Sequence, residues 1–321
     1  MAPRHRVPSD GLTVLRFGIQ LPHYGAGPLG LGLDALVDAI IDAGFDGIWV
    51  SDHVVLIDGT TSAYPYTDDG DYGFPADTPW YEAVAMLAYL AARTHEVELG
   101  TAVCVLPQRQ PVLLAKQLAT IDRLADGRVR LGAGAGWLAE EFTALGVPYD
   151  GRGARTDAAI ALLRDCWTGT PAPGRYGDVS VPGGVHCRPT PVNGSVPILV
   201  GGNSPAALRR AARLGDGWLG AVPLAGLSAD ELGGMVARLR QECDQVGRNP
   251  STLDLSLRIA APSHALGTPA LRDLLLGYAE HGVTRFTVDL SWRDFDTGRR
   301  RLDALSRTAA AVRESLTAGA T

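Results

Sequence analysis

The side chains best suited to chemistry stand directly after short apolar runs. Ser51-Asp52-His53 follows the run 47–50, which is typical of a buried strand. A carboxylate next to an imidazole can orient the ring, and both groups can hydrogen-bond a heterocycle. A lone histidine is more often structural, but at the carboxyl end of a parallel barrel strand it more often meets a ligand. We therefore predict that His53 is catalytic and that Asp52 takes part in binding.

A second candidate, Gly201-Gly202-Asn203-Ser204, also follows an apolar run. The two glycines let the backbone come close to a ligand. Ser204 is a good N-cap and Pro205 a good first helical residue, so free N–H groups and the helix dipole would favour an anion at this end. The segment is either a phosphate cradle or an ordinary capped turn, and the motif alone does not separate the two.

The glycine-rich segment 132–136 is not a dinucleotide fingerprint. Its pattern is G-x-G-x-G, and Trp137 stands where the last glycine of G-x-G-x-x-G would be. The segment also lies in the middle of the chain, after three complete strand–helix units. A thin strip of backbone at Ala135 and Gly136 would leave room for a flat ring. The alternative is tight packing of the strand against its helix.

Four large side chains at strand ends are predicted to line a substrate pocket. His23 and Tyr24 follow the first predicted strand, Trp137 follows the fourth, and Trp292 follows the last. In a parallel barrel these ends meet at one face, where loops build the active site. The sequence therefore assigns these four residues to the substrate pocket.

Other charged residues are assigned to structure. Glu140 and Glu141 are expected on an exposed helix face. Lys116, the only lysine, belongs to the helix after the third strand, and we expect it to pair with Asp122 or Asp126. No spacing of His, Cys, Asp or Glu fits a metal site, so no metal is predicted.

These candidates need a fold that brings strand ends together. Short apolar runs alternate with helical periodicity along the chain. Eight strand–helix units are predicted, with strands at 14–20, 47–50, 97–103, 128–133, 197–200, 217–221, 253–260 and 285–288. Eight such units favour an α/β fold, a closed parallel (β/α)8 TIM barrel, and the alternative is a doubly wound open sheet.

The barrel is predicted to be a single domain, residues 13–321, after a flexible tail, residues 1–12. Two long segments interrupt it. A polar and aromatic insertion, residues 54–79, follows strand two, and a Gly/Pro-rich insertion, residues 169–195, precedes strand five. Both are expected to shape the pocket or to act as lids.

The composition of the chain argues against some classes of binding partner. The 321 residues carry 29 Lys and Arg against 35 Asp and Glu, a net charge of −6. Because there is no basic tract, neither nucleic acid nor an anionic membrane is an expected partner. The start of the chain lacks the apolar stretch of a signal peptide, and the longest apolar run, 83–92, is too short to span a bilayer. With no C-x-x-C pair among the cysteines, a reduced, cytoplasmic protein is expected.

Together the motifs resemble those of the bacterial-luciferase-like family of flavin and deazaflavin barrels. Within it, the chain is most similar to the branch of probable coenzyme F420-dependent oxidoreductases. The resemblance extends from about residue 14 to residue 310. The matching segments are Phe17-Gly18-Ile19, 44–53, Tyr64-Pro65-Tyr66, Leu99-Gly100-Thr101, 106–117, 131–142 and 201–218.

The resemblance implies a place for the cofactor ring. Asp52 and His53 would contact it, with the histidine near the face that exchanges a hydride. Ala102-Val103 would form a non-proline cis peptide that buttresses the ring. The residues beside the ring would be Ala135 and Gly136.

The resemblance also implies a place for the cofactor's anionic part. The loop at the fifth strand end would bind the phosphate through Gly201, Gly202, Asn203 and Ser204. The anionic tail would meet arginines, for which the sequence offers Arg109, Arg188, Arg209 and Arg210 without ranking them.

At two positions the chain departs from its relatives. F420-dependent sugar-phosphate and alcohol dehydrogenases carry a catalytic glutamate just after the strand-four glycines, where this chain has Trp137. They supply another acidic residue from the strand-one loop, where this chain has Tyr24. A bulky indole suits an apolar or aromatic substrate better than a sugar phosphate.

The main hypothesis is therefore an oxidoreductase that transfers a hydride between coenzyme F420 and a small organic substrate. One alternative is an FMN-dependent luciferase-like monooxygenase that uses reduced flavin and O2. Another is a non-catalytic flavin-binding barrel. A homodimer is expected from the resemblance.

Overall fold

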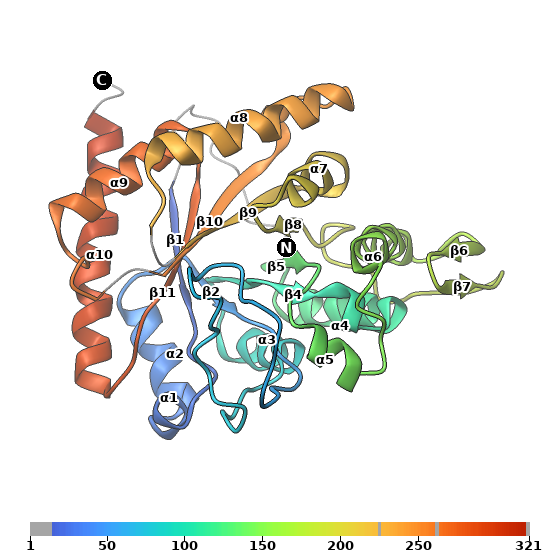
Figure 1. Ribbon diagram of the computed structural model, residues 1–321, viewed down its shortest axis with the longest axis horizontal. Coiled ribbons are helices and arrows are strands. Elements are labelled where there is room, and N and C mark those ends of the chain that lie inside the picture. Colours follow the sequence, from blue (N-terminus) through green and yellow to red (C-terminus); the bar gives the residue numbers. More distant parts are fainter. Residues whose placement is uncertain (1–14, 224–225, 261–262, 319–321) are drawn as a thin grey trace.

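The computed structural model describes residues 15–223, 226–260 and 263–318. The predicted tail, residues 1–12, lies outside this part of the chain. Nine of the described strands form one parallel sheet in the order β3-β2-β1-β11-β10-β9-β8-β5-β4, and a further pairing of β3 with β5 closes it. Because β3 and β4 are two parts of one barrel strand, the sheet has eight positions (Figure 1). The predicted (β/α)8 barrel is confirmed, and the open doubly wound sheet is wrong.

The strands are β1 (Arg16–Gln20), β2 (Gly47–Val50), β3 (Glu98–Thr101), β4 (Cys104–Val105), β5 (Val129–Gly134), β6 (Gly174–Tyr176), β7 (Val179–Val181), β8 (Ile198–Gly201), β9 (Gly217–Val222), β10 (Asp254–Ala260) and β11 (Arg285–Asp289). The α-helices are α1 (Ala26–Gly30), α2 (Leu33–Asp42), α3 (Ala83–Arg93), α4 (Pro111–Leu124), α5 (Ala139–Ala144), α6 (Arg152–Trp167), α7 (Pro205–Leu214), α8 (Ala229–Gln245), α9 (Pro269–Glu280) and α10 (Phe295–Ala318).

Several helices begin where the sequence supplies a capping side chain before a proline. In α7 the Ser204 hydroxyl accepts a hydrogen bond from the Ala207 amide, and in α9 Thr268 caps in the same way. In α4 the Gln110 side chain accepts from the Leu113 amide. A cap satisfies one of the free N–H groups, and proline lacks one, so these starts are fixed locally.

The barrel interior is filled by one tryptophan. Trp49 of β2 is 2% exposed and packs with Leu199 and Leu219 from the opposite strands. A Cβ at Gly100 would lie 2.4 Å from the indole, and one at Gly18 would lie 2.8 Å from it. Glycines on both neighbouring strands therefore make room for the ring inside the barrel.

The base of the barrel is closed by an ionic network, which we call the basal network. Glu98 contacts Arg16, Arg130 and Arg285, and Asp254 contacts Arg130 and Arg285. Burial alone would raise the pKa of Glu98, but the surrounding guanidinium groups outweigh it and lower the pKa. Each acid therefore meets at least two cations.

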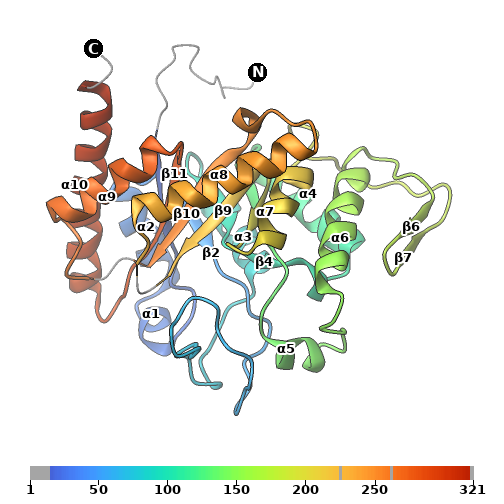
Figure 2. The same cartoon turned by 45° about the horizontal axis from the view of Figure 1, so that its top comes forward.

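The two insertions occupy different parts of the molecule. The β2–α3 connection lies at the same end of the barrel as α1 and α5 (Figure 2). Residues 169–195 contain the antiparallel hairpin β6–β7, which projects beside α6, away from the barrel axis (Figure 1). Of the described residues that line the large cavity, none belongs to this hairpin segment. The expectation that residues 169–195 shape the pocket is therefore wrong.

Within the described ranges, no helix combines the length and hydropathy needed to cross a membrane.

Candidate active site

A cavity of about 790 Å³ opens at the carboxyl ends of the strands. The first insertion covers it with Tyr64, Tyr66 and Tyr72, and the opposite wall is the loop from β8 into α7. Apart from Asp52, His53 and Trp137, the predicted site residues that line it are Ala102, Val103, Ala135, Gly136, Gly201, Gly202, Asn203 and Ser204. The structure thus brings together both segments that the sequence singled out.

The His53 imidazole is fixed by an acid from another element. Its Nδ1 lies 3.2 Å from Oε2 of Glu141 on α5, and both side chains are almost completely buried. Glu141 also accepts hydrogen bonds from the Val54 amide at 2.6 Å and from Nε2 of Gln108 at 3.1 Å. Burial would raise the pKa of Glu141, but these hydrogen bonds, led by that from His53, hold it below its ordinary value.

The protonation of Glu141 determines the tautomer of His53. An ionised carboxylate only accepts hydrogen bonds, so Nδ1 of the histidine must carry the proton between them. Nε2 then faces the cavity, and among the described residues it has no hydrogen-bond partner. His53 is therefore a free acceptor, or a donor once protonated, in the position a general acid–base group needs.

The expectation that Glu141 lies on an exposed helix face is wrong, since the residue is 1% exposed. The sequence contained a signal for this position. Leu138, Glu141, Phe142 and Leu145 follow the spacing i, i+3, i+4 and i+7, which places the glutamate on the apolar face. A lone acid on such a face requires a buried partner, but the partner is 88 residues away in the chain.

Glu140 was also expected to be a simple surface residue, and it instead holds the covering loop. Its Oε1 accepts hydrogen bonds from the amides of Thr61, at 2.7 Å, and Ser62, at 3.2 Å. These contacts lower the pKa of Glu140 to about 2. Two consecutive glutamates on α5 thus fasten both ends of the segment 54–62.

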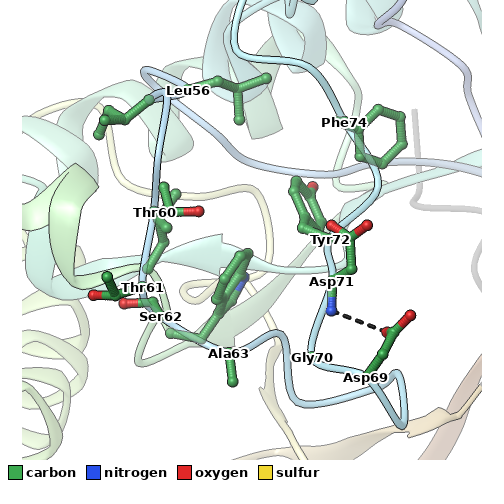
Figure 3. Close-up of a pocket in the computed structure, with 13 residues that line it drawn as sticks. Leu56, Thr60, Thr61, Ser62, Ala63, Asp69, Gly70, Asp71, Tyr72 and Phe74 are labelled. Atoms are coloured by element: carbon green, nitrogen blue, oxygen red, sulfur yellow. Dashed lines mark hydrogen bonds between the residues drawn. The ribbon is translucent and has the colours of Figure 1, made fainter.

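The fastened segment encloses a smaller pocket of about 320 Å³ beside the cavity. Figure 3 shows Thr60 and Ser62 on one side of it, with Tyr72 and Phe74 on the other. Tyr72 and Trp137 line both spaces, and their ring centroids lie 5.0 Å apart. The two aromatic side chains therefore form the partition between the cavity and the smaller pocket.

Asp52 has a different role from its neighbour. Its carboxylate accepts a hydrogen bond from Nη2 of Arg109 at 2.6 Å and another from the Val105 amide at 2.9 Å, and its side chain has no exposed surface. Arg109 continues to Glu82 at 2.7 Å. Any contact of Asp52 with a ligand must therefore come from its main chain, and Arg109 is not free for a cofactor tail.

The floor of the cavity is the irregular stretch between β3 and β4. The Ala102–Val103 peptide bond is cis, as the resemblance implies. The Val103 side chain packs where a Cβ at Gly134 or at Gly201 would lie 2.4 Å away. Glycine at both positions therefore lets the two flanking strand ends close on this peptide.

Positive charge gathers at the α7 side of the cavity. Arg152, at the start of α6, donates from Nε to the Gly136 carbonyl at 3.0 Å, and its guanidinium lies 3.8 Å from the Tyr149 ring. Its two terminal nitrogens have no partner among the described residues. Arg210 also lines the cavity and contacts Asp157 and the Gly153 carbonyl. With the α7 N-terminus, these groups form an anion-binding corner.

Only some of the groups that the sequence offered for an anionic ligand are available at this corner. Arg210 reaches the cavity, whereas Arg188 and Arg209 are not among its lining residues, and Arg209 lies 3.9 Å from Glu242. Asn203 lines the cavity, but its amide is used to join the β9 end, since Nδ2 donates to the Ala221 carbonyl and Oδ1 accepts from the Ala221 amide. Arg152 was missed because no motif surrounds it.

Three predicted pocket residues do not reach the cavity. His23 is fully buried, with Nδ1 2.8 Å from the Leu21 carbonyl and Nε2 3.0 Å from the Ser51 carbonyl. Tyr24 stacks behind the cavity on Trp80 at 4.1 Å. Trp292 packs on Gly298, where a Cβ would lie 2.0 Å from the ring. A position at the end of a strand does not by itself determine which way the side chain faces. Of the four predicted pocket residues, the structure places only Trp137 at the cavity.

Lys116 also differs from its expected contacts. Its ammonium donates to the Arg188 carbonyl. Asp122 is buried and instead accepts from the Val192 amide at 2.8 Å. The lysine thus fixes the second insertion to α4, away from the site.

The fold and site define a parallel (β/α)8 barrel with a cavity at the carboxyl ends of its strands, and comparison with known proteins identifies the family. Residues 32–308 match the luciferase-like monooxygenase family, so the chain belongs to that family. The uncharacterized protein Rv0940c of Mycobacterium tuberculosis is 34% identical over 215 residues, which cover 66% of this chain and 72% of that protein.

Two further similarities involve proteins named for F420. The F420-dependent glucose-6-phosphate dehydrogenase of Nakamurella multipartita is 32% identical over 249 residues, 75% of this chain and 65% of that protein. An F420-dependent secondary alcohol dehydrogenase, solved with an F420–acetone adduct, superposes with a TM-score of 0.73 at 18% identity. That superposition covers 93% of this chain and 99% of the other, and it supports the fold.

Proposed function

We propose that this protein is an oxidoreductase that transfers a hydride between coenzyme F420 and a small aromatic or apolar organic substrate. The observation that carries the proposal is the shape and charge of one cavity. It joins a peptide shelf at Ala102–Val103, an anion-binding corner at Arg152 and α7, and a histidine with a free Nε2. A flat anionic cofactor needs a shelf and a cationic corner together.

The residues present fit such a cofactor. Gly202 has a φ of +111°, a conformation that residues with a side chain rarely adopt, so the main chain is bare at this part of the cradle. The uncommitted terminal nitrogens of Arg152 offer charged donors to a phosphate or a carboxylate. Bound F420 would supply or accept the hydride.

The chain itself would move the proton. With Nδ1 held by Glu141, Nε2 of His53 can donate a proton to a substrate atom that gains negative charge or remove one in the reverse direction. Glu141 acts through the histidine and is a positioning residue. The aromatic cover keeps water from the reacting atoms, which strengthens electrostatic interactions inside the cavity.

Two features favour an aromatic or apolar substrate. Trp137 occupies the position of the glutamate that related dehydrogenases carry, and it contacts Tyr64 at 5.2 Å between ring centroids. Tyr72 contacts both Trp137 and His53, at 5.0 and 4.9 Å. The wall beside the histidine is therefore a set of rings, on which another flat ring can stack.

The second candidate is an FMN-dependent monooxygenase, because the family that the chain matches is described as luciferase-like monooxygenases. The same corner would accept the FMN phosphate.

Fluorescence titration of the apo-protein with F420 and with FMN separates the two. The proposal expects saturable F420 binding that weakens in Ser204→Asp, because the added carboxylate repels an anion at the α7 N-terminus. Tight FMN binding without F420 binding would support the alternative. Ser228→Asp, at the start of α8, is a matched control that should change neither affinity, since residue 228 is not among the residues that line the cavity.

A further inference from the structure

A half-buried arginine in the barrel mouth takes no part in the proton transfer proposed for His53. Arg258 of β10 lines the cavity. Its guanidinium binds Asp289 of β11 through Nε and Nη2, at 3.0 and 2.9 Å to Oδ2, and it donates from Nη1 to the Ala102 carbonyl at 2.8 Å. The same side chain thus joins two strand ends to the shelf at the cis peptide.

Strand alternation places this charge inside the barrel. Leu257 and Ile259 belong to the core between strands and helices, whereas Ser256 and Arg258 alternate with them. A charge at an inward position of a barrel strand, close to the carboxyl end, belongs to the functional face. Arg258 is therefore placed to meet a ligand in the cavity, as well as to join the strand ends.

The hydrogen bonds of Arg258 leave part of it unused. A guanidinium has five N–H groups, and the bonds to Asp289 and Ala102 use one on each nitrogen. One N–H on each terminal nitrogen remains, and among the described residues these two have no acceptor. Since Asp289 and Ala102 hold the planar group on two sides, the free donors have a fixed direction.

Apart from Asp289, the side chains around Arg258 in the cavity are mainly aromatic. Its positive charge acts on the hydroxyls of Tyr24, Tyr64, Tyr66 and Tyr72. Burial raises the pKa of Tyr66 to about 12 and that of Tyr72 well above its ordinary value, so these hydroxyls stay neutral. The hydroxyls of Tyr64, Tyr66 and Tyr72 have no hydrogen-bond partner within the described residues.

We infer that Arg258 is a substrate-binding residue that holds the carbonyl oxygen of a flat conjugated substrate, an inference that rests on the proposed hydride transfer. Asp289 neutralises the guanidinium, so a permanent anion gains little net charge attraction from the pair. A carbonyl oxygen fits the two free donors in the ground state and binds them more strongly as it gains negative charge.

The step balances with the groups named. The reduced deazaflavin class of cofactor supplies a hydride to a carbon of the substrate, either the carbonyl carbon or the β-carbon conjugated with it. The π-electron pair moves to the carbonyl oxygen, which the N–H groups of Arg258 stabilise. Protonated His53 then gives its Nε2 proton to the product, and the cofactor leaves oxidised by two electrons.

Calorimetric titration with 1-indanone and indane tests the inference on the protein saturated with F420. The two probes share size and shape, and they differ in the carbonyl group. The wild type should bind 1-indanone at least tenfold more tightly than indane. In the double variant Arg258→Met/Asp289→Leu, which removes both charges and leaves neither buried alone, the preference should vanish, with indane affinity unchanged as the check on folding.

Each other outcome has a distinct meaning. No ketone preference in the wild type, or an unchanged preference in the double variant, overturns the inference. Loss of F420 binding in the double variant, measured separately, also overturns it, because Arg258 would then hold the cofactor. If the wild type does not bind F420, the proposed function fails, and the same two probes without cofactor still show whether Arg258 selects a carbonyl.

Discussion

The two ends of the barrel use buried charge in opposite ways. In the basal network, Glu98 and Asp254 each meet at least two arginines, and Arg130 and Arg285 each meet both acids. At the mouth, Arg258, Arg152 and His53 are each hydrogen-bonded to one or two residues, and these bonds leave further donors or acceptors at the cavity. Charges that satisfy one another build the fold, whereas charges that are half satisfied are available to a ligand.

The largest expected effect is at the mouth. His53→Ala removes the proton-transfer group and should lower the rate of F420-linked turnover by about 10²- to 10⁴-fold. F420 affinity should change little, since the shelf and the cationic corner remain. His186→Ala, an exposed histidine of the second insertion, is the control and should keep the wild-type rate. A rate within tenfold of wild type in His53→Ala would contradict the assigned role.

At the base of the barrel, a substitution should lower the stability of the protein and leave F420 binding unchanged. Glu98→Ala leaves Arg16 without an acid and leaves Arg130 and Arg285 with Asp254 alone. It should lower the free energy of unfolding by about 3 kcal/mol, because three cations then face one carboxylate in a partly buried network. Urea denaturation measures the loss, and F420 titration of the same variant should give the wild-type affinity. If the variant loses F420 binding while its stability is unchanged, the division between base and mouth is wrong.

A smaller effect is expected in the anion-binding corner. Arg152→Ala should weaken F420 binding about tenfold, the size of one charge-assisted hydrogen bond. The matched control, Arg209→Ala, removes an arginine of α7 that does not line the cavity and should leave the affinity unchanged. Equal losses in both variants would indicate a general effect of net charge and no specific corner.

The smallest effect concerns the loop that α5 fastens. The pKa of Glu140 is lowered from 4.5 to about 2, so its contribution is fully present above pH 4.5 and is lost as the pH falls toward 2. Amide hydrogen exchange at Thr61 and Ser62, corrected for the intrinsic pH dependence, should therefore become less protected over this range. Glu140→Gln should show the reduced protection already at neutral pH, and its protection should not fall further as the pH is lowered. Unchanged protection in that variant would mean that the carboxylate does not hold the loop.

The order of the helices and strands could be predicted from the sequence, because the residues that mark each element lie within it or directly beside it. Alternation of apolar runs, the prolines after capping residues and the glycines at strand ends mark where helices and strands begin. Two main segments that line the cavity, at His53 and at Gly201–Ser204, followed from their place at strand ends alone. The short helix α1 and the hairpin β6–β7 were missed, since neither has enough residues for a period to show.

The rest of the site depends on contacts distant in sequence. Glu141 and His53 are 88 residues apart, and Ala102 and Arg258 are 156 apart. Neither pair has a sequence motif that joins its members. The assignments of His23 and Trp292 failed for a related reason: each stands near a strand end, but the preceding main chain turns the side chain into the core. Side-chain direction after a strand is determined by packing that the local sequence does not contain.

Hydrogen–deuterium exchange with and without saturating F420 tests the division between mouth and base most directly. The account predicts slower exchange on F420 addition in residues 51–66, 134–137 and 201–207, which line or cover the cavity. It predicts no change in the segments around Glu98 and Arg285, which close the base. Protection at the base, or no protection at the mouth under saturating F420, would contradict the account.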